Sequence, residues 1–256
     1  MQLNTEFMVQ TFWDALAGIP VTLEITIVAL LVAFPIGFWM ALHRMRGKGI
    51  INRLVSLYVS LMRSTPIVLQ ILFFYSLLPS LLNYYLNTEW ELGVDVFGIN
   101  PIVYAFLVFG LNTTAVLSEV FRSALMTIGA GQMEAALCAG LSSGQAYRRI
   151  IIPQGLASAM PNICNATVSL LKSTSLAYLM TVKDITAIAK TKAAYGYNYI
   201  EAYLVIFFIY ILLCTLVQLL FRQIEAVFNR HKAQQTAKMP KSPKSHTSGK
   251  LSIQVD

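Results

Sequence analysis

The chain has 256 residues, of which 56% are hydrophobic and 12% are charged. A water-soluble domain has about a quarter of its residues charged, so this composition excludes an ordinary soluble domain and indicates a membrane protein. The net charge of +7 does not indicate a nucleic-acid-binding protein, because the basic residues lie between apolar segments and in the C-terminal tail.

The N-terminal residues and the cysteines narrow the class further. Residues 1–18 lack the basic region and short apolar core of a secretory signal, so no cleaved signal peptide is expected. Residues 1–15 are predicted to be an extracytoplasmic segment. Cys138, Cys164 and Cys214 are isolated in the sequence, and their spacing predicts neither a disulfide framework nor a metal site.

Windows of about twenty apolar residues predict five transmembrane helices. They lie at about 16–42, 54–82, 101–120, 156–180 and 203–221. The chain is therefore predicted to be an all-α, polytopic membrane protein whose transmembrane domain covers residues 16–230.

The charges between these helices predict the orientation. The loop after the first helix is strongly basic, and by the positive-inside rule it lies in the cytoplasm, with the N-terminus outside; its cations are Arg44, Arg46, Lys48 and Arg53. The loop at 83–100 has three acidic residues and no Lys or Arg, as expected of an outer loop. Five crossings then place the C-terminus in the cytoplasm. The lysine-containing loop after residue 180 fits this rule least well.

Two features of the chain bear on assembly. Residues 231–256 are polar, basic and proline-containing, so they are predicted to be a disordered cytoplasmic tail. Their positive charge suggests an attraction to anionic lipid headgroups. An odd number of helices without an internal repeat disfavours a carrier built from inverted repeats. A second subunit, identical or homologous, would then supply the symmetry of the pathway.

Four ionisable residues lie within the predicted helices: Glu24, Arg63, Glu119 and Lys172. Each costs about 2.5–3.5 kcal/mol or more in hydrocarbon unless it has a partner or a wet cavity. Arg63 precedes Pro66, which lacks a backbone donor and therefore predicts a bend or break in the second helix. Arg63 either clamps helices by pairing with a carboxylate such as Glu119, or belongs to a joint that moves during transport.

The fourth predicted helix has a polar stripe. Its residues fall at offsets 0, 3, 7, 10 and 11, which is one face of an α-helix; they are Asn162, Asn165, Ser169, Lys172 and Ser173. The third helix has a matching polar group at Asn112, Thr113 and Thr114. Both sets either hold helices together through hydrogen bonds or line the path of a polar solute.

Residues 129–153, GAGQMEAALCAGLSSGQAYRRIIIP, form the one long polar, helix-prone segment between two apolar ones. Composition predicts a helix, a turn at Gly140, and a second short helix from 142 or 143 to 151 that Pro153 stops. By itself this hairpin is equally well interpreted as an amphipathic loop on the membrane. The order Glu134-Ala135-Ala136, Gly140, Ile150, Ile152, Pro153 resembles the EAA signature of ABC-importer permeases. That resemblance implies a cytoplasmic element at 122–155 that docks into an ATPase subunit.

Further strings resemble the polar amino-acid permease family, and the resemblance is collinear from 18 to 192. They are RSTP at 63–66, SEVFRSAL at 118–125, GQMEAA at 131–136, IIPQ at 151–154 and LLKSTSL at 170–176. The resemblance implies a type I ABC-importer permease in a bacterial cell membrane, with a cytoplasmic ATPase homodimer, a second permease subunit and an extracytoplasmic amino-acid-binding protein as partners. Because the chain has no GxxxxGK[ST] motif, ATP and Mg are expected on the ATPase, and this chain is expected to be neither an enzyme nor the holder of a cofactor.

Two departures from the family pattern affect the substrate. Ser173 stands where the family's KDTSL string has an aspartate, and Ala115 and Val116 stand where an AY pair often precedes the glutamate. Loss of that carboxylate favours neutral or sulfur-containing amino acids, such as cystine, over cationic ones. The alternatives are an ATP-independent channel or carrier, an importer of another small solute, and a scaffold or sensor subunit.

Overall fold

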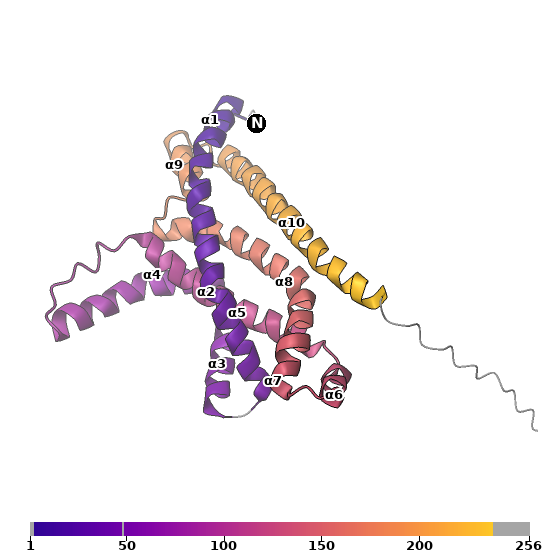
Figure 1. Ribbon diagram of the computed structural model, residues 1–256. Helices are drawn as coiled ribbons and strands as arrows, with labels where there is room; N and C mark the ends of the chain where they lie inside the picture. The colour runs from indigo at the N-terminus through magenta and orange to yellow at the C-terminus, as the bar shows by residue number, and fades with distance from the viewer. Residues whose placement is uncertain (1–2, 48, 238–256) are drawn as a thin grey trace, which may run out of the picture.

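The computed structural model describes residues 3–47 and 49–237, and in this part of the chain all regular structure is helical (Figure 1). The prediction of an all-α protein is therefore confirmed. The elements are α1 Thr5–Ala15, η1 Leu16–Gly18, α2 Ile19–Arg46, α3 Ile50–Ser64, α4 Ile67–Asn83, η2 Tyr84–Glu89, α5 Pro101–Met126, α6 Ala130–Cys138, α7 Ser143–Ala146, η3 Tyr147–Ile151, α8 Ile152–Ser173, η4 Thr174–Met180, α9 Ile185–Gly196 and α10 Tyr199–Ala237.

Four helical segments of the described residues are long and apolar enough to cross a membrane: Thr5–Met45, Ile67–Glu89, Pro101–Met126 and Tyr199–Ala226. The fourth predicted crossing falls on α8 and η4, which are not among them. The Asn, Ser and Thr residues of α8 lower its hydropathy below that of α2, α4, α5 and α10. The number of five crossings, and the orientation of the termini, stay predictions.

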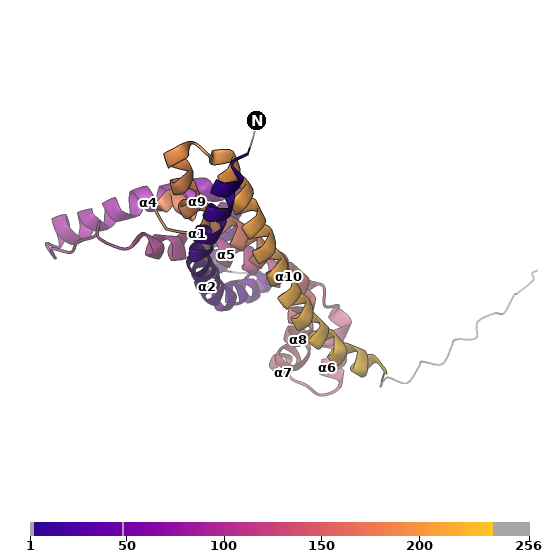
Figure 2. The same ribbon diagram turned by 90° about the horizontal axis from the view of Figure 1, so that it is seen from above.

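The second predicted helix, at 54–82, is not one helix but two. It breaks at Thr65 and Pro66, both of which have extended backbone angles. Pro66 cannot donate a backbone hydrogen bond to α3, and its ring disfavours α geometry at Thr65. The break turns α4 away from the rest of the molecule, as the views in Figures 1 and 2 show.

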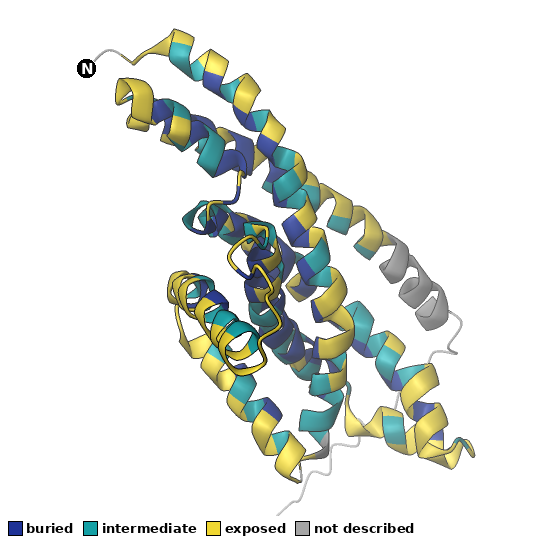
Figure 3. Cartoon of the chain, turned by 90° about the vertical axis from the view of Figure 1, so that its left-hand side faces the viewer, coloured by how far each residue is buried: buried dark blue, intermediate teal, exposed yellow. Residues whose placement is uncertain are grey.

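The core is organised around α5, which packs against α2, α3, α4 and α8. Most residues of α5 between 104 and 118 are buried, and the buried residues of the chain gather in the middle of the molecule (Figure 3). Helix α5 lies close to α2, where a β-carbon at Gly37 would be 3.1 Å from Ser118 N and Thr114 O. Small residues let membrane helices approach closely, so this contact fixes α5 as the central helix.

One end of the molecule is formed by α1, α9 and the start of α10 (Figure 1). Lys192 pairs with Asp14, and Asn4 N donates to Glu201 Oε1 at 3.1 Å. The predicted extracytoplasmic segment is thus mostly helical. Helix α10 runs from this end of the molecule to Ala237, past the predicted start of the tail at 231. Residues 238–256 lie outside the described residues.

A buried carboxylate lies at this same end. Asp184 is fully buried at the N-cap of α9, where its Oδ1 accepts from Ala187 N at 2.8 Å. The Tyr210 hydroxyl lies 3.5 Å from its Oδ2. Burial is the main reason why the pKa of Asp184 is raised from 3.8 to about 6, and the hydrogen bond from Ala187 opposes this shift.

This carboxylate predicts a pH dependence of stability. Between pH 4 and pH 6 the unfolded chain loses the Asp184 proton before the folded chain does, so stability falls as pH rises through this window and then levels off. The loss is at most about 3 kcal/mol. We expect Asp184→Asn, which keeps the acceptor for Ala187, to unfold at a higher temperature than the wild type at pH 7.5 and to lose most of this pH dependence. Asp95→Asn, at an exposed carboxylate, is the control; equal pH profiles of wild type and Asp184→Asn would contradict the prediction.

Candidate functional site

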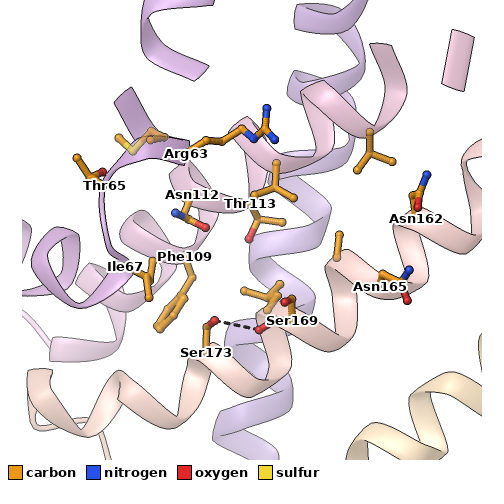
Figure 4. Close-up of a pocket in the computed structure, with 15 residues that line it drawn as sticks. Arg63, Thr65, Ile67, Phe109, Asn112, Thr113, Asn162, Asn165, Ser169 and Ser173 are labelled. Carbon is orange, nitrogen blue, oxygen red and sulfur yellow. Dashed lines mark hydrogen bonds between the residues drawn. The ribbon is translucent and has the colours of Figure 1, made fainter. Parts of the chain in front are cut away.

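A polar cavity of about 550 Å³ lies between α3, α5 and α8 (Figure 4). Its lining includes Met62, Arg63, Thr65, Ile67, Phe109, Asn112, Thr113, Val116, Val120, Asn162, Asn165, Ala166, Ser169, Leu170 and Ser173. Arg63 is the only one of these that is ionisable. The cavity therefore offers amides, hydroxyls and one guanidinium group.

The break at Pro66 forms one wall of this cavity, and Gln70 stabilises it. Because α3 ends at Ser64, its last carbonyl groups lack intrahelical donors. The Nε2 of Gln70 lies 2.8 Å from Met62 O, 3.1 Å from Thr65 O and 2.7 Å from Thr65 Oγ1. Asn112 Nδ2 in turn donates to Gln70 Oε1 at 3.0 Å. The broken helix is thus tied to α5 by a polar network at the edge of the cavity.

The polar stripe of α8 forms the opposite wall. Asn162, Asn165, Ser169 and Ser173 all line the cavity, and Ser173 Oγ donates to Ser169 O at 2.9 Å (Figure 4). Lys172 belongs to the same predicted stripe but is not part of the lining. At 100 degrees per residue, Lys172 lies 80 degrees round the helix from Asn162, so it is at the edge of the stripe.

The predicted polar group of α5 is divided between two faces. Asn112 and Thr113 face the polar cavity, whereas Thr114 lines an apolar groove on another side of the helix. The hydroxyl of Thr114 donates to Gly110 O at 2.7 Å, within its own helix. Thr114 is therefore satisfied locally and adds nothing to the cavity.

Three arginines surround Glu119 near one end of the cavity. Arg44 Nη1 lies 2.7 Å from Glu119 Oε2, and Arg122 Nη2 lies 2.5 Å from Glu119 Oε1. The predicted partner, Arg63, lies 3.9 Å from Oε2, and its side chain is 50% exposed. The tight partners of Glu119 are thus on α2 and α5, while Arg63 of α3 makes a longer contact and faces the cavity.

The predicted hairpin lies at the end of the molecule opposite α1 and α9 (Figure 1). Its first helix, α6, ends at Cys138, and the turn that follows includes Gly140, whose φ is +82°. Leu141 N donates to Ala136 O and Gly140 N to Leu137 O, which is a Schellman motif. Ser142 and Gln145 then form a capping box that starts α7. The turn at Gly140 has the predicted position.

The second helix of the hairpin does not stop at Pro153. The chain passes from α7 through the π-helical segment η3 into α8 without a break, and Pro153 lies in the first turn of α8. Pro153 cannot donate a backbone hydrogen bond to the preceding turn, and that turn is the wider π segment η3. The second half of the hairpin and the polar stripe are therefore parts of one continuous helical rod.

Most residues of the hairpin are exposed. Glu134 and Ala135 are exposed, whereas Ala136 is buried. Gln154 Nε2 lies 3.5 Å from Gln132 Oε1 across the base of the hairpin. The hairpin is thus an exposed helix and turn that lead directly into the cavity-lining helix α8.

Sequence reasoning missed three residues of this region: Gln70, Arg44 and Arg122. Gln70 has a local signal, since it follows Pro66 by one helical turn and can reach the carbonyl groups that the proline leaves unpaired. Arg122 also has one, because it is three residues after Glu119 on the same helix. Arg44 is 75 residues from Glu119, and only the packing of α2 on α5 brings them together.

A family model and several known permeases match most of this chain. Residues 33–229 match the family described as binding-protein-dependent transport system inner membrane component. The chain is 34% identical to the L-cystine transport system permease protein TcyL of Bacillus subtilis, over 82% of this chain and 84% of that protein. It is 30% identical to the histidine/lysine/arginine/ornithine transport system permease protein HisM of Escherichia coli, over 84% and 88% respectively.

A solved structure has the same fold. The crystal structure of an amino acid ABC transporter with histidines matches with a TM-score of 0.72 and 25% identity, over 90% of this chain and 100% of that chain. The family match covers well over half of the sequence. The chain therefore belongs to the binding-protein-dependent transport system inner membrane components, as a multi-pass, non-enzymatic permease subunit of the amino-acid ABC transporter class.

Proposed function

We propose that this chain forms the solute pathway of an ATP-driven importer for polar amino acids in a bacterial cell membrane. The observation that carries this proposal is the polar cavity between the α3–α4 break and the stripe of α8. An exposed stripe of Asn and Ser side chains is costly against lipid, so it needs a polar solute, water or another protein beside it. A binding-protein-dependent permease provides all three.

The proposed assembly has two permease subunits, a cytoplasmic ATPase homodimer and an extracytoplasmic amino-acid-binding protein. Each permease crosses the membrane five times, with the N-terminus outside and the C-terminus inside. The hairpin at 122–155 then lies in the cytoplasm, beside the basic residues Arg122, Arg148 and Arg149. Glu134, Ala135 and Gly140 contact the ATPase, while the buried Ala136 packs within the chain, and the basic C-terminal segment is proposed to lie on the same side.

The mechanism follows from the continuity of the hairpin with α8. When the ATPase pair closes on ATP, it moves α6, and the rod through Pro153 transmits this movement to the stripe at Asn165, Ser169 and Ser173. Tilting of α8 opens the cavity to one side of the membrane at a time. Helix α8 thus has two positions, and nucleotide binding to the ATPase sets the balance between them. The α3–α4 break at Pro66 is a further place at which the helices can move.

The charges of the cavity favour a neutral, zwitterionic solute. Arg63 can pair with a carboxylate group of an amino acid, and the amides and hydroxyls can bind a neutral polar side chain. No carboxylate lines the cavity, so a cationic side chain would enter without a counter-charge. We therefore favour neutral or sulfur-containing amino acids such as cystine over arginine or lysine.

Substitution of Ser173 tests this preference. In proteoliposomes that contain the whole complex, we expect Ser173→Asp to raise ATP-dependent uptake of cationic relative to neutral amino acids by about tenfold, which corresponds to about 1.4 kcal/mol. Ser175→Asp, two residues further on and outside the cavity lining, is the matched control. An unchanged preference in Ser173→Asp would contradict the assignment of this cavity to the solute.

Copurification tests the class of transporter. When this chain is purified from detergent-solubilised membranes, a soluble ATPase is expected to copurify with it in a fixed ratio. Uptake is expected to need ATP. Uptake by the chain alone, without ATP, would instead indicate a channel or carrier.

A further inference from the structure

Asn112 belongs both to the lining of the polar cavity and to the hydrogen-bond network behind it. Its Nδ2 lies 3.0 Å from Oε1 of Gln70, a residue of α4 that is 6% exposed and is not part of the lining. The nitrogen of an amide donates hydrogen bonds and the oxygen accepts them. The orientation of the Gln70 amide therefore decides which atom of Asn112 is left for the cavity.

The α3–α4 break fixes the orientation of the Gln70 amide. Its Nε2 lies 2.8 Å from Met62 O and 3.1 Å from Thr65 O, and both are carbonyl oxygens, which can only accept. Thr65 Oγ1, 2.7 Å away, also accepts from Gln70, because it donates its own hydrogen to Leu61 O at 2.8 Å. A reversed amide would place the Gln70 oxygen against two carbonyl oxygens and leave them without a donor. The amide nitrogen must therefore face the break, and Oε1 must face α5.

The Gln70 amide in turn sets the direction of the Asn112 side chain. Because Gln70 Oε1 can only accept, Asn112 must turn its Nδ2 toward it, and Asn112 Oδ1 then points to the other side. Figure 4 shows the nitrogen of Asn112 on the side of Thr65 and its oxygen on the side of α8. A hydroxyl group can donate or accept by rotating, whereas an amide oxygen only accepts. Asn112 thus presents to the cavity an acceptor that a buried neighbour holds in place.

This acceptor and the guanidinium group of Arg63 suit the two charged ends of an amino acid. Arg63 has only donors, which pair with a carboxylate group. An ammonium group also has only donors, so it needs an oxygen such as Asn112 Oδ1. Both residues line the same cavity of about 550 Å³, a volume typical of small-molecule sites. The side chain of the solute is then left to the polar stripe of α8.

We propose that Gln70 is a positioning residue, which holds Asn112 Oδ1 as the acceptor for the α-ammonium group of a solute whose α-carboxylate pairs with Arg63. This inference rests on the proposed function, because it assigns the two ends of the solute within the same cavity. The recognised class is then the free α-amino acid as a zwitterion, whatever its neutral side chain. The Pro66 break is part of this recognition, since it frees the carbonyl groups that hold Gln70 in place.

Equilibrium binding to the permease–ATPase complex tests this assignment. The complex is purified in detergent without nucleotide and without the binding protein, so that the binding protein does not select the ligand. Labelled neutral amino acids, cystine among them, are compared. The one that binds most tightly is then displaced by two of its own analogues, one without the α-amino group and one without the α-carboxylate. For cystine these are dithiodipropionate and cystamine.

The wild type is expected to prefer the complete amino acid over both analogues. We expect each analogue to bind at least about tenfold more weakly, since hydrogen bonds to charged groups are stronger than those between neutral groups. The preference over the first analogue measures recognition of the ammonium group. The preference over the second measures recognition of the carboxylate.

Variants separate the two ends of the solute. We expect Gln70→Met, and likewise Asn112→Leu, to lose most of the preference over the analogue without an amino group but to keep the preference over the analogue without a carboxylate. Arg63→Gln is expected to show the reverse. A general loss of packing would lower both preferences together, so the preference that is retained reports an intact cavity. Thr114→Val, two residues after Asn112 and outside the polar cavity, is the matched control and is expected to keep both preferences.

Two results would overturn this inference and leave the proposed function standing. The first is equal binding of the amino acid and the analogue without an amino group by the wild type. The second is an unchanged preference over that analogue in Gln70→Met or in Asn112→Leu. Binding of none of the neutral amino acids by the wild type would instead contradict the assignment of the cavity to the solute, and this inference with it.

Discussion

Replacing Glu119 with glutamine is expected to lower the free energy of unfolding by about 3 kcal/mol. Its side chain is 21% exposed and is in contact with the guanidinium groups of Arg44 and Arg122, with Arg63 at 3.9 Å. Removing the one anion leaves partly buried cations that repel one another, and loss of one partner from a buried ion pair costs about 3–5 kcal/mol. The partial exposure of Glu119 places the expected effect at the lower end of this range.

Thermal unfolding of the purified protein in detergent measures this effect. A loss of about 3 kcal/mol corresponds to a decrease of about 6–12 °C in a chain of this size. The double variant Glu119→Gln with Arg44→Gln removes one cation together with the anion, so it is expected to regain part of the lost stability. Arg63→Gln alone is expected to have a small effect, because Arg63 is half-exposed and makes the longest contact. An unfolding temperature of Glu119→Gln equal to that of the wild type would show that the arginines are held apart by other groups.

Replacing Gly140 with valine is expected to reduce uptake by at least tenfold while ATP hydrolysis and membrane insertion continue. Gly140 has φ +82°, and its added β-carbon would meet no atom within 4 Å, so the cost is one of backbone strain and not of collision. A β-branched residue in this conformation costs about 1–3 kcal/mol. The hairpin can relieve the strain by opening the turn between α6 and α7, which breaks the rigid connection to α8.

The matched control is Gly140→Asn, because asparagine tolerates a left-handed backbone and often replaces glycine at the end of a helix. We expect this variant to transport at a rate within about twofold of the wild type. ATP-dependent uptake, ATPase activity and the amount of chain in the membrane are measured on the same proteoliposomes. If Gly140→Val transports normally, the turn at Gly140 is not needed for coupling. If it is absent from the membrane, Gly140→Ala, with less strain, is the variant to compare.

Local patterns in the sequence were sufficient for much of the fold. The apolar windows predict helices where α2, α5 and α10 lie, and the turn at Gly140 has the predicted position. Pro66 marks the break between α3 and α4, although the pattern 54–82 alone suggests one bent helix. Helix type and turn position depend on residues a few positions apart, so they can be read from the chain.

The site was predicted less completely. The spacing of Asn162, Asn165, Ser169 and Ser173 on one face of a helix is a periodic signal, and the structure places all four in the polar cavity. Lys172 shares that spacing but lies outside the cavity lining, and Thr114 faces the apolar groove. A period of 3.6 residues gives an approximate direction for each side chain. It does not give the position of the neighbouring helix, which decides where a cavity ends.

The sequence by itself determined the class of this protein: an all-α membrane protein with a polar stripe, a broken second helix and a hairpin of the EAA type. Only the tertiary structure decided which residues meet. It pairs Glu119 with Arg44 across 75 residues, ties Gln70 to Asn112, continues the hairpin through Pro153 into α8, and opens an apolar groove at Gly110. The reason is physical: helix propensity and periodicity are set by neighbours along the chain, whereas ion pairs and cavities depend on the packing of helices that are distant in sequence.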